Sequence, residues 1–364
     1  MTKKETNSKR FKILSIDGGG IRGIIPCKIL AELETELIRR EGHEARLCDY
    51  FDLICGTSTG GIIAIGLSLG LKASDILELY VEHGKEIFPS TRRNKLHKGI
   101  CFVRNFPFYE RGTLKRLLKD VYNKVTIDKD TRIGHARTRL LVPVYNSEHG
   151  TIHIFKTAHH SGLVNDYQIP AVDVALATSA APVYFEPYSF TYTVKGTCVE
   201  KTYRNIIDGG IVANNPSYLG LTEAMAGLNM PLKDISLLSL GTGIDYFAKN
   251  ISSSKMGAGF WANPINKNGL QIYEMLAAAQ AENIDNNIKI LNNGISNTCE
   301  NSLEYLRIQH YFGTGESIGL DDASDEAIER MNSIAQQLYR RNGVNIEKLF
   351  LNEKVDKFEP FKTL

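Results

Sequence analysis

The hydrophobic residues of this chain gather in short runs, and two of these runs each lead into a glycine-rich turn and then an apolar helix pattern. Phe11–Ile16 has the composition of a buried strand, and a helix is expected after its glycine turn, over about residues 24–39. The same order returns with a strand at 51–55 and a helix of small and apolar residues at 61–69. Two such units predict an α/β fold, with a mostly parallel sheet covered by helices on both faces.

Later apolar runs predict four more strands, at 140–145, 152–155, 205–207 and Ile235–Leu240. The sequence contains no internal repeat, low-complexity tract or proline-rich linker. One main domain is therefore the simplest organisation.

We expect a flexible basic N-terminus at 1–10, a main domain at 11–320 and a C-terminal helical extension at 321–364. Apolar residues in the extension follow helical spacing behind an acidic run: Ile328, Met331, Ile334, Ala335 and Leu338. This spacing predicts a terminal helix that packs on the main domain.

Composition limits the location and partners of the protein. The 364 residues carry a formal net charge of +2, which is too small to indicate binding to a nucleic acid polymer. No apolar segment follows the polar start, and the longest apolar stretch, 61–71, is shorter than the roughly 20 residues of a membrane-spanning helix. The six cysteines stand singly, without metal-ligand spacing. We therefore expect a cytoplasmic protein with reduced thiols and no bound metal.

Residues 85–119 combine positive charge with aromatic side chains. Ten residues of this segment are basic and two are acidic. Its aromatic residues are Phe88, Phe102, Phe106, Phe108 and Tyr109. The mixture suits a surface that receives an anionic activator or the membrane. A solvated loop that sends a few aromatic side chains into the core produces the same pattern, so both interpretations stay open.

The first candidate for chemistry is Ser58, the centre of a G-x-S-x-G element. Gly56 and Gly60 flank it, and the element lies between an apolar strand and an apolar helix. A nucleophile on such a tight turn needs small residues on either side and is exposed at a helix N-terminus, where backbone N–H groups favour negative charge. A serine that caps an ordinary helix is the alternative, and this context favours the nucleophile.

A serine nucleophile needs a base, which is most often a histidine that follows an acid in the chain. The only histidine after Asp208 is His310, and the eight earlier histidines lie in no recognisable motif. Asp208 itself ends an apolar run and precedes two glycines. A carboxylate that contacts the serine directly is therefore the candidate base, provided that burial raises its pKa toward neutrality.

The third candidate is the glycine turn at residues 17–23. Gly18, Gly20 and Gly23 match the dinucleotide fingerprint, and Glu41 and Glu44 follow about 20 residues later. A Rossmann-type, nucleotide-binding oxidoreductase is thus the alternative function. It leaves the serine and aspartate motifs unexplained, whereas an oxyanion hole made from the same glycine turn uses all three.

Together, four segments resemble the patatin-like phospholipases: DGGGIRG at 17–23, GTSTG at 56–60, ATSAAPVYF at 177–185 and DGG at 208–210. Their order and spacing span residues 11–243, about two-thirds of the chain. The resemblance implies a three-layer α/β/α fold and a calcium-independent acyl hydrolase, without a cofactor, that cleaves fatty-acyl esters of membrane phospholipids.

Carried over by residue, the resemblance assigns Ser58 as the nucleophile and Asp208 as the base of a Ser–Asp dyad. It also implies that the segment around Pro182 helps to shape the site, where the residues alone indicate only a small-residue packing surface. The nucleophile elbow and the oxyanion hole are assigned to Gly56 and Gly60, and to Gly18, Gly19, Gly20 and Arg22.

Compact cytosolic bacterial patatins resemble phospholipase effectors of anti-phage signalling, which attack the cell's own membrane when a cyclic nucleotide is sensed. The expected partners are therefore phospholipid at the inner face of the membrane, a cyclic-nucleotide activator and further copies of the chain. A non-catalytic protein that keeps the fold is a third interpretation, and the intact Ser58 and Asp208 argue against it.

Overall fold

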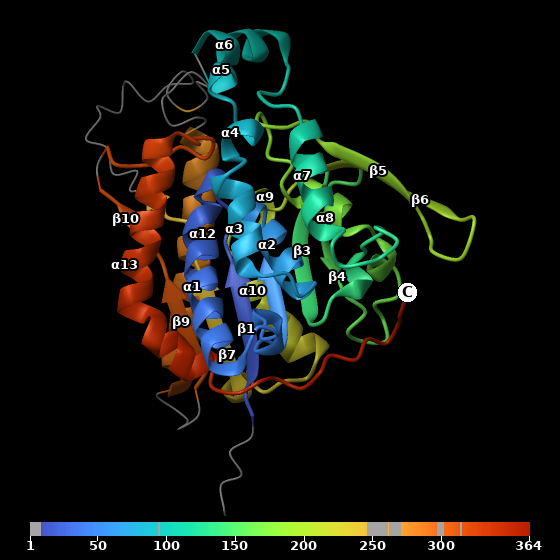
Figure 1. Ribbon diagram of the computed structural model, residues 1–364, viewed down its shortest axis with the longest axis vertical. Coiled ribbons are helices and arrows are strands. Elements are labelled where there is room, and N and C mark those ends of the chain that lie inside the picture. The colour runs from blue at the N-terminus through green and yellow to red at the C-terminus, as the bar shows by residue number, and fades with distance from the viewer. Residues whose placement is uncertain (1–8, 94, 246–260, 262–270, 297–301, 314) are drawn as a thin grey trace, which may run out of the picture.

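All six residues of β1, Phe11–Ile16, are buried, because this strand runs through the middle of the main sheet. β1 pairs in parallel with β2, Leu53–Gly56, on one side and with β7, Ile235–Leu240, on the other. The computed structural model describes residues 9–93, 95–245, 261, 271–296, 302–313 and 315–364 (Figure 1).

The strand order of the main sheet is β5-β6-β3-β2-β1-β7-β9, and β4 pairs with β3. β3 continues the parallel set beside β2, and β9 continues it beside β7. β4, β5 and β6 make antiparallel pairs at the other end. The remaining strands of this sheet are β3 Arg139–Asn146, β4 Thr151–Lys156, β5 Tyr188–Thr193, β6 Glu200–Asp208 and β9 Glu304–Ile308. A small second sheet pairs β8 Ile244–Asp245 with β10 Tyr311–Phe312.

Alternate residues of β1 enter two separate hydrophobic cores, one on each face of the sheet. Leu14 and Ile16 join the larger core, whereas Phe11 and Ile13 join the smaller one. A strand whose side chains alternate in direction is buried throughout only when both faces are covered. The expected three-layer α/β/α fold is therefore confirmed.

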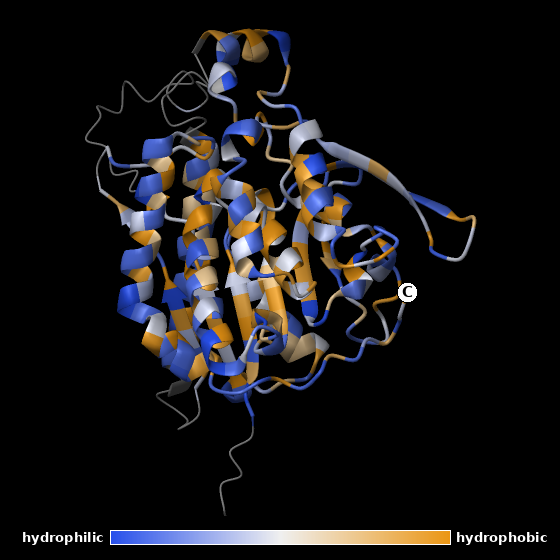
Figure 2. Cartoon of the chain, viewed as in Figure 1, coloured by the Kyte–Doolittle hydropathy of each residue, from blue (hydrophilic) through white to orange (hydrophobic). Residues whose placement is uncertain are grey.

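The larger core is covered by helices from both ends of the chain. These are α1 Ile24–Glu41, α2 Thr59–Ser68, α3 Ala73–Val81, α7 Gly112–Tyr122, α8 Ala171–Thr178 and α13 Asp325–Phe350. The smaller core is covered by α10 Ser217–Thr222, the π-helix Glu223–Gly227 and α12 Gln271–Ser296. Short helices complete the fold: α4 Gly84–Ile87, α5 Ser90–Arg93, α6 Lys95–Arg104 and α9 Gly210–Ala213. Orange apolar positions concentrate where helices meet the sheet (Figure 2).

The C-terminal extension contains the expected helix. Its apolar row is buried on α13, which packs along α1 (Figure 1). The chain between 243 and the extension, which no sequence motif explained, contributes β9 to the sheet edge. Most of the predicted flexible N-terminus, residues 1–8, lies outside the described residues. Within the part of the chain that is described, no helix has the length and apolar character needed to cross a membrane.

Candidate active site

Ser58 lies in the turn between β2 and α2, as the G-x-S-x-G pattern predicts. Its backbone has φ 55° and ψ −123°, a conformation that side-chain-bearing residues rarely adopt. Such strain at the end of a buried strand is characteristic of functional turns. The turn leaves the side chain half-buried, at the edge of a pocket rather than within the core.

The glycines on either side make this turn possible. A Cβ atom at Gly56 would lie 2.0 Å from the carbonyl oxygen of Gly60, and one at Gly60 would lie 2.3 Å from the carbonyl oxygen of Ile16. Neither backbone atom can move away without breaking the sheet or the first turn of α2. Both positions therefore require glycine, as predicted for the elbow.

Asp208, the last residue of β6, contacts the serine directly. Ser58 Oγ donates a hydrogen bond to Asp208 Oδ2 at 2.6 Å, and the Gly210 N–H donates to Oδ1, also at 2.6 Å. The carboxyl group is fully buried, and burial raises the pKa of Asp208 to about 7 against the opposing effect of the two hydrogen bonds. A carboxylate with a pKa near neutrality can accept a proton from a serine hydroxyl.

The segment at 177–181, which the sequence indicates only as a packing surface, holds both members of this pair. The Thr178 hydroxyl accepts the Ser58 N–H at 3.1 Å and donates to the Pro143 carbonyl at 2.9 Å. The Asp208 N–H donates to the Ala180 carbonyl, and the Gly209 N–H to the Thr178 carbonyl. One short segment thus sets the positions of two residues that are 150 residues apart in the chain.

The glycine turn that follows β1 faces the same pocket as Ser58. The Gly18 N–H donates to the Asn214 carbonyl at 3.0 Å. Among the described residues, the amides of Gly19 and Gly20 have no such partner. Gly20 adopts φ +57°, which favours glycine. The turn therefore brings two backbone N–H groups without a partner in the described residues, those of Gly19 and Gly20, to the wall of the pocket.

Arg22 also lines the pocket, although its side chain is largely buried. Its guanidinium lies over the Phe312 ring, 6.0 Å from the centroid. Within the described part of the chain, Arg22 Nε is buried without a hydrogen-bond partner. A buried donor in this state favours an anionic or polar ligand in the adjoining space.

An ion pair that the sequence did not reveal anchors the glycine turn. Arg307 on β9 binds both carboxylate oxygens of Asp17, with Nη1 2.8 Å from Oδ1 and Nη2 2.5 Å from Oδ2. Both side chains are almost completely buried. Two parallel hydrogen bonds fix direction as well as distance, so β9 orients the first residue of the turn.

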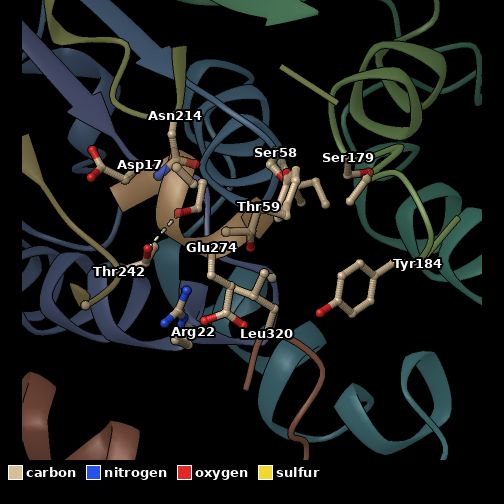
Figure 3. Close-up of a pocket in the computed structure, with 18 of the residues that line it drawn as sticks. Asp17, Arg22, Ser58, Thr59, Ser179, Tyr184, Asn214, Thr242, Glu274 and Leu320 are labelled. Carbon is tan, nitrogen blue, oxygen red and sulfur yellow. Dashed lines mark hydrogen bonds between the residues drawn. The ribbon is translucent and has the colours of Figure 1, made fainter. Parts of the chain in front are cut away.

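These groups surround a cleft that opens to solvent and has a volume of about 950 Å³ when its open mouth is included. Figure 3 shows Arg22, Ser58 and Tyr184 around this space. Most of the remaining wall is apolar, with Ile62, Ile87, Phe88, Leu114, Phe185 and Leu320 among its residues. The cleft thus places the Ser58 hydroxyl and hydrogen-bond donors beside an apolar wall.

No histidine is among the described residues that line this cleft, and the base that bonds to Ser58 Oγ in the described part of the chain is Asp208. The acidic residues that the dinucleotide interpretation needs, Glu41 and Glu44, do not lie at the glycine turn. Glu44 follows the end of α1, and Glu41 is the last of the 18 residues of this helix, about 27 Å along it from the turn. Glu41 pairs there with Arg40 and Lys354, too far away to bind a ribose at the turn.

A cluster with the composition of a metal site, His159, His160 and Glu223, lies outside this cleft. Lys156 Nζ lies 2.5 Å from Glu223 Oε2, and His159 Nε2 lies 2.8 Å from Oε1. Burial alone would raise the pKa of Glu223, but these hydrogen bonds outweigh it and lower the pKa to about 2. The carboxylate is thus already bound by the Lys156 ammonium and the His159 ring, and the fit to a metal ion is poor.

The chain is similar to known proteins over most of its length. A family profile described as "Patatin-like phospholipase" matches residues 14–219, which include the serine, the buried carboxylate and the glycine turn. The "cGAMP-activated phospholipase" of Escherichia coli (strain TW11681) is 32% identical over 361 residues, covering 97% of this chain and 95% of that protein. "Patatin-like protein 2" of Arabidopsis thaliana is 30% identical over 360 residues, covering 90% and 83%. The crystal structure of VipD from Legionella pneumophila aligns with a TM-score of 0.40 and 13% identity, covering 92% of this chain and 67% of that one.

Proposed function

Because the chain belongs to the patatin-like phospholipase family, we propose that it cleaves fatty-acyl esters of membrane phospholipids through a Ser58–Asp208 dyad. The observation that carries this proposal is the 2.6 Å hydrogen bond from Ser58 Oγ to the buried carboxylate of Asp208. The apolar wall of the cleft suits an acyl chain, and the donors beside Ser58 suit its ester group.

In the proposed first step, Ser58 Oγ attacks the ester carbonyl carbon and its proton passes to Asp208 Oδ2. The carbonyl oxygen becomes an oxyanion, which the Gly19 and Gly20 N–H groups and the Arg22 side chain stabilise. Gly18 shapes the turn, since its own N–H is already bonded to Asn214. The carbon–oxygen bond to the leaving alcohol then breaks, and that oxygen takes the proton from Asp208.

The second step releases the fatty acid from Ser58. Water attacks the acyl-enzyme carbonyl while Asp208 accepts a proton from it, and the same donors hold the second oxyanion. Collapse of this intermediate returns the proton to Ser58 Oγ. Both half-reactions need Asp208 deprotonated at the start, which a pKa of about 7 permits near neutral pH.

The proposal includes control by a cyclic nucleotide and a role as a membrane-degrading effector in anti-phage defence. Bacterial relatives from Escherichia coli, Vibrio cholerae and Pseudomonas aeruginosa are named cGAMP-activated phospholipases, at 29–32% identity. We therefore expect cGAMP, or a related cyclic di- or trinucleotide, to increase hydrolysis of phospholipid by this chain.

The direct test is fatty acid release from phospholipid vesicles, with and without a panel of cyclic di- and trinucleotides. Ser58→Ala and Asp208→Asn are each expected to lower the rate by at least about 10³-fold. Ser147→Ala, at an exposed serine away from the cleft, serves as the matched control and should keep full activity. Wild-type hydrolysis by Ser58→Ala would refute the dyad.

Labelling by a fluorophosphonate separates this proposal from the two alternatives. An acyl hydrolase should be labelled at Ser58, and a non-catalytic protein with the same fold should not. A nucleotide-binding oxidoreductase should instead bind NAD(H) saturably, whether or not Ser58 is present. Saturable NAD(H) binding without labelling at Ser58 would favour the oxidoreductase.

A further inference from the structure

Helix α6 turns an aliphatic row toward solvent. Leu96, Ile100 and Val103 recur at spacings of four and three residues and so share one face, where their exposed fractions are 74%, 47% and 81%. The same helix buries Lys98 and Cys101 against the protein. A helix on the surface of a water-soluble domain normally has the opposite orientation, with its apolar row inward.

Buried polar contacts fix this orientation. Lys98 Nζ lies 2.7 Å from Asp321 Oδ2, and each of the two side chains is only 6% exposed. Tyr109 donates its hydroxyl to the same carboxylate oxygen at 2.6 Å. Because a rotation that buried the aliphatic row would pull Lys98 away from Asp321, the outward direction of this row is built into the fold.

The same contacts connect α6 to the wall of the cleft. Asp321 follows Leu320, which lines the cleft and whose carbonyl accepts the Ile21 N–H in the glycine turn. The Tyr109 N–H donates to the carbonyl of Tyr184, another lining residue. In Figure 1, α5 and α6 stand out from the body of the protein above α4.

The segment at 85–119 therefore divides between the two interpretations that its sequence left open. Phe108 and Tyr109 are buried, as in the core-aromatic interpretation. Phe102 and Phe106 are 55% and 61% exposed, on the same projection as the aliphatic row.

The segment has ten basic and two acidic residues. Lys98 is buried against Asp321 and Arg92 pairs with Glu110, but Arg104, which follows Val103 on α6, is exposed. The excess of positive charge favours contact with a negatively charged surface.

We propose that the docking face, defined as Leu96, Ile100, Phe102, Val103 and Phe106, inserts into the interfacial layer of an anionic phospholipid bilayer. An exposed apolar face amid positive charge binds such a surface both by burial of apolar area and by electrostatic attraction. The docking face would hold the mouth of the cleft against the layer that contains the substrate. This inference rests on the proposed function, because it takes phospholipid as the substrate.

The test measures binding separately from hydrolysis. Full-length protein carrying Ser58→Ala, which leaves lipid intact, is floated with vesicles of phosphatidylcholine alone or mixed with phosphatidylglycerol, with and without cGAMP. The triple variant Leu96→Ser, Ile100→Ser, Val103→Ser should bind the mixed vesicles at least about tenfold more weakly. The matched control is Ile127→Ser, Val199→Ser, Val344→Ser, which changes aliphatic residues of similar exposure elsewhere and should bind normally.

The outcomes separate this inference from the proposed function. One outcome is that the protein with Ser58 intact cleaves a water-soluble ester, whereas the Ser58→Ala protein binds no vesicles with or without cGAMP. This would refute the docking face and leave the proposed hydrolysis standing. If vesicles are bound through the docking face but no ester is cleaved, the docking face stands and the proposed function fails. An equal loss of binding in the control triple refutes the docking face. A changed oligomeric mass of the triple variant, with normal vesicle binding, would instead identify the face as a contact between copies of the chain.

Discussion

Asp208 gives the proposed dyad a specific response to pH. Burial raises the pKa of this carboxyl to about 7, and only the deprotonated form can accept the serine proton. We therefore expect kcat/KM for a water-soluble ester to rise about tenfold per pH unit below pH 7 and to level off above it. A pH–rate profile measures this, and a flat profile between about pH 5 and 8 would contradict the assignment.

The raised pKa of Asp208 also affects stability. As pH rises, activity is expected to increase and stability to decrease. Since the folded-state pKa of about 7 lies above the ordinary value of 3.8, the native state loses stability as pH rises from about 3.8 to about 7, where the unfolded chain releases a proton that the native state still holds. Asp208→Asn keeps a neutral group at this position, so its Tm should exceed that of the wild type at pH 9 and approach it near pH 4. Thermal unfolding at the two pH values tests this, and a more stable wild type at pH 9 would exclude it.

Arg307 is expected to act by positioning the glycine turn. Arg307→Met leaves the buried carboxylate of Asp17 without its partner, which should lower the free energy of unfolding by about 3–5 kcal/mol. Arg39→Met removes an exposed ion pair with Glu36 and should change stability little. Urea unfolding compares the two. Equal effects would show that the Asp17–Arg307 pair has no special role.

Among single residues, the sequence identifies those whose chemistry is indicated by their immediate neighbours in the chain. Ser58 stands in a five-residue pattern, and Asp208 ends an apolar run before two glycines. Arg307 carries no local signal, because its importance comes from a contact with a residue 290 positions away. Thr178 belongs to the segment at 177–185 that carries the family resemblance, but its contact with Ser58, 120 positions away, has no local signal either. Only the fold reveals such pairings.

Among the elements, the contact between α13 and α1 tests whether the C-terminal extension is integral to the fold. Met331 on α13 is completely buried in the larger core. Met331→Ala should therefore reduce the free energy of unfolding by about 2–5 kcal/mol, because it leaves a cavity. Val344→Ala, on the same helix but 82% exposed, should have little effect. Urea unfolding of both variants measures this, and a silent Met331→Ala would favour a loosely attached extension.

Helices and strands with one clear hydrophobic pattern could be predicted from the sequence. Those whose orientation depends on a contact that breaks the usual pattern could not. β1 and β7 have uniform apolar patterns, and the structure places both at the predicted bounds. The regular apolar row expected in the C-terminal extension is buried on α13. α6 escaped prediction because it reverses the usual rule, with a buried lysine and an exposed aliphatic row. The partner that makes this arrangement stable, Asp321, lies 223 residues further along the chain.

For the whole molecule, an activator that binds the folded chain should also stabilise it. If cGAMP binds only the native state, a concentration 100-fold above its Kd adds about 2.7 kcal/mol to the free energy of unfolding. We expect this to appear as a higher Tm, and to persist in Ser58→Ala, because binding does not require the nucleophile. Unchanged melting of both proteins across a cGAMP titration would argue against direct binding.

The contact between Asp17 and Arg307 joins two residues that lie far apart in the chain. The glycine turn, Ser58 and Asp208 all precede Arg307, which comes almost 100 residues after Asp208. A fragment that stops before β9 therefore contains Ser58 and Asp208 without the arginine that orients the glycine turn. Under the proposed function, we expect such a fragment to lack the geometry needed to cleave an ester, although both proposed dyad residues are present.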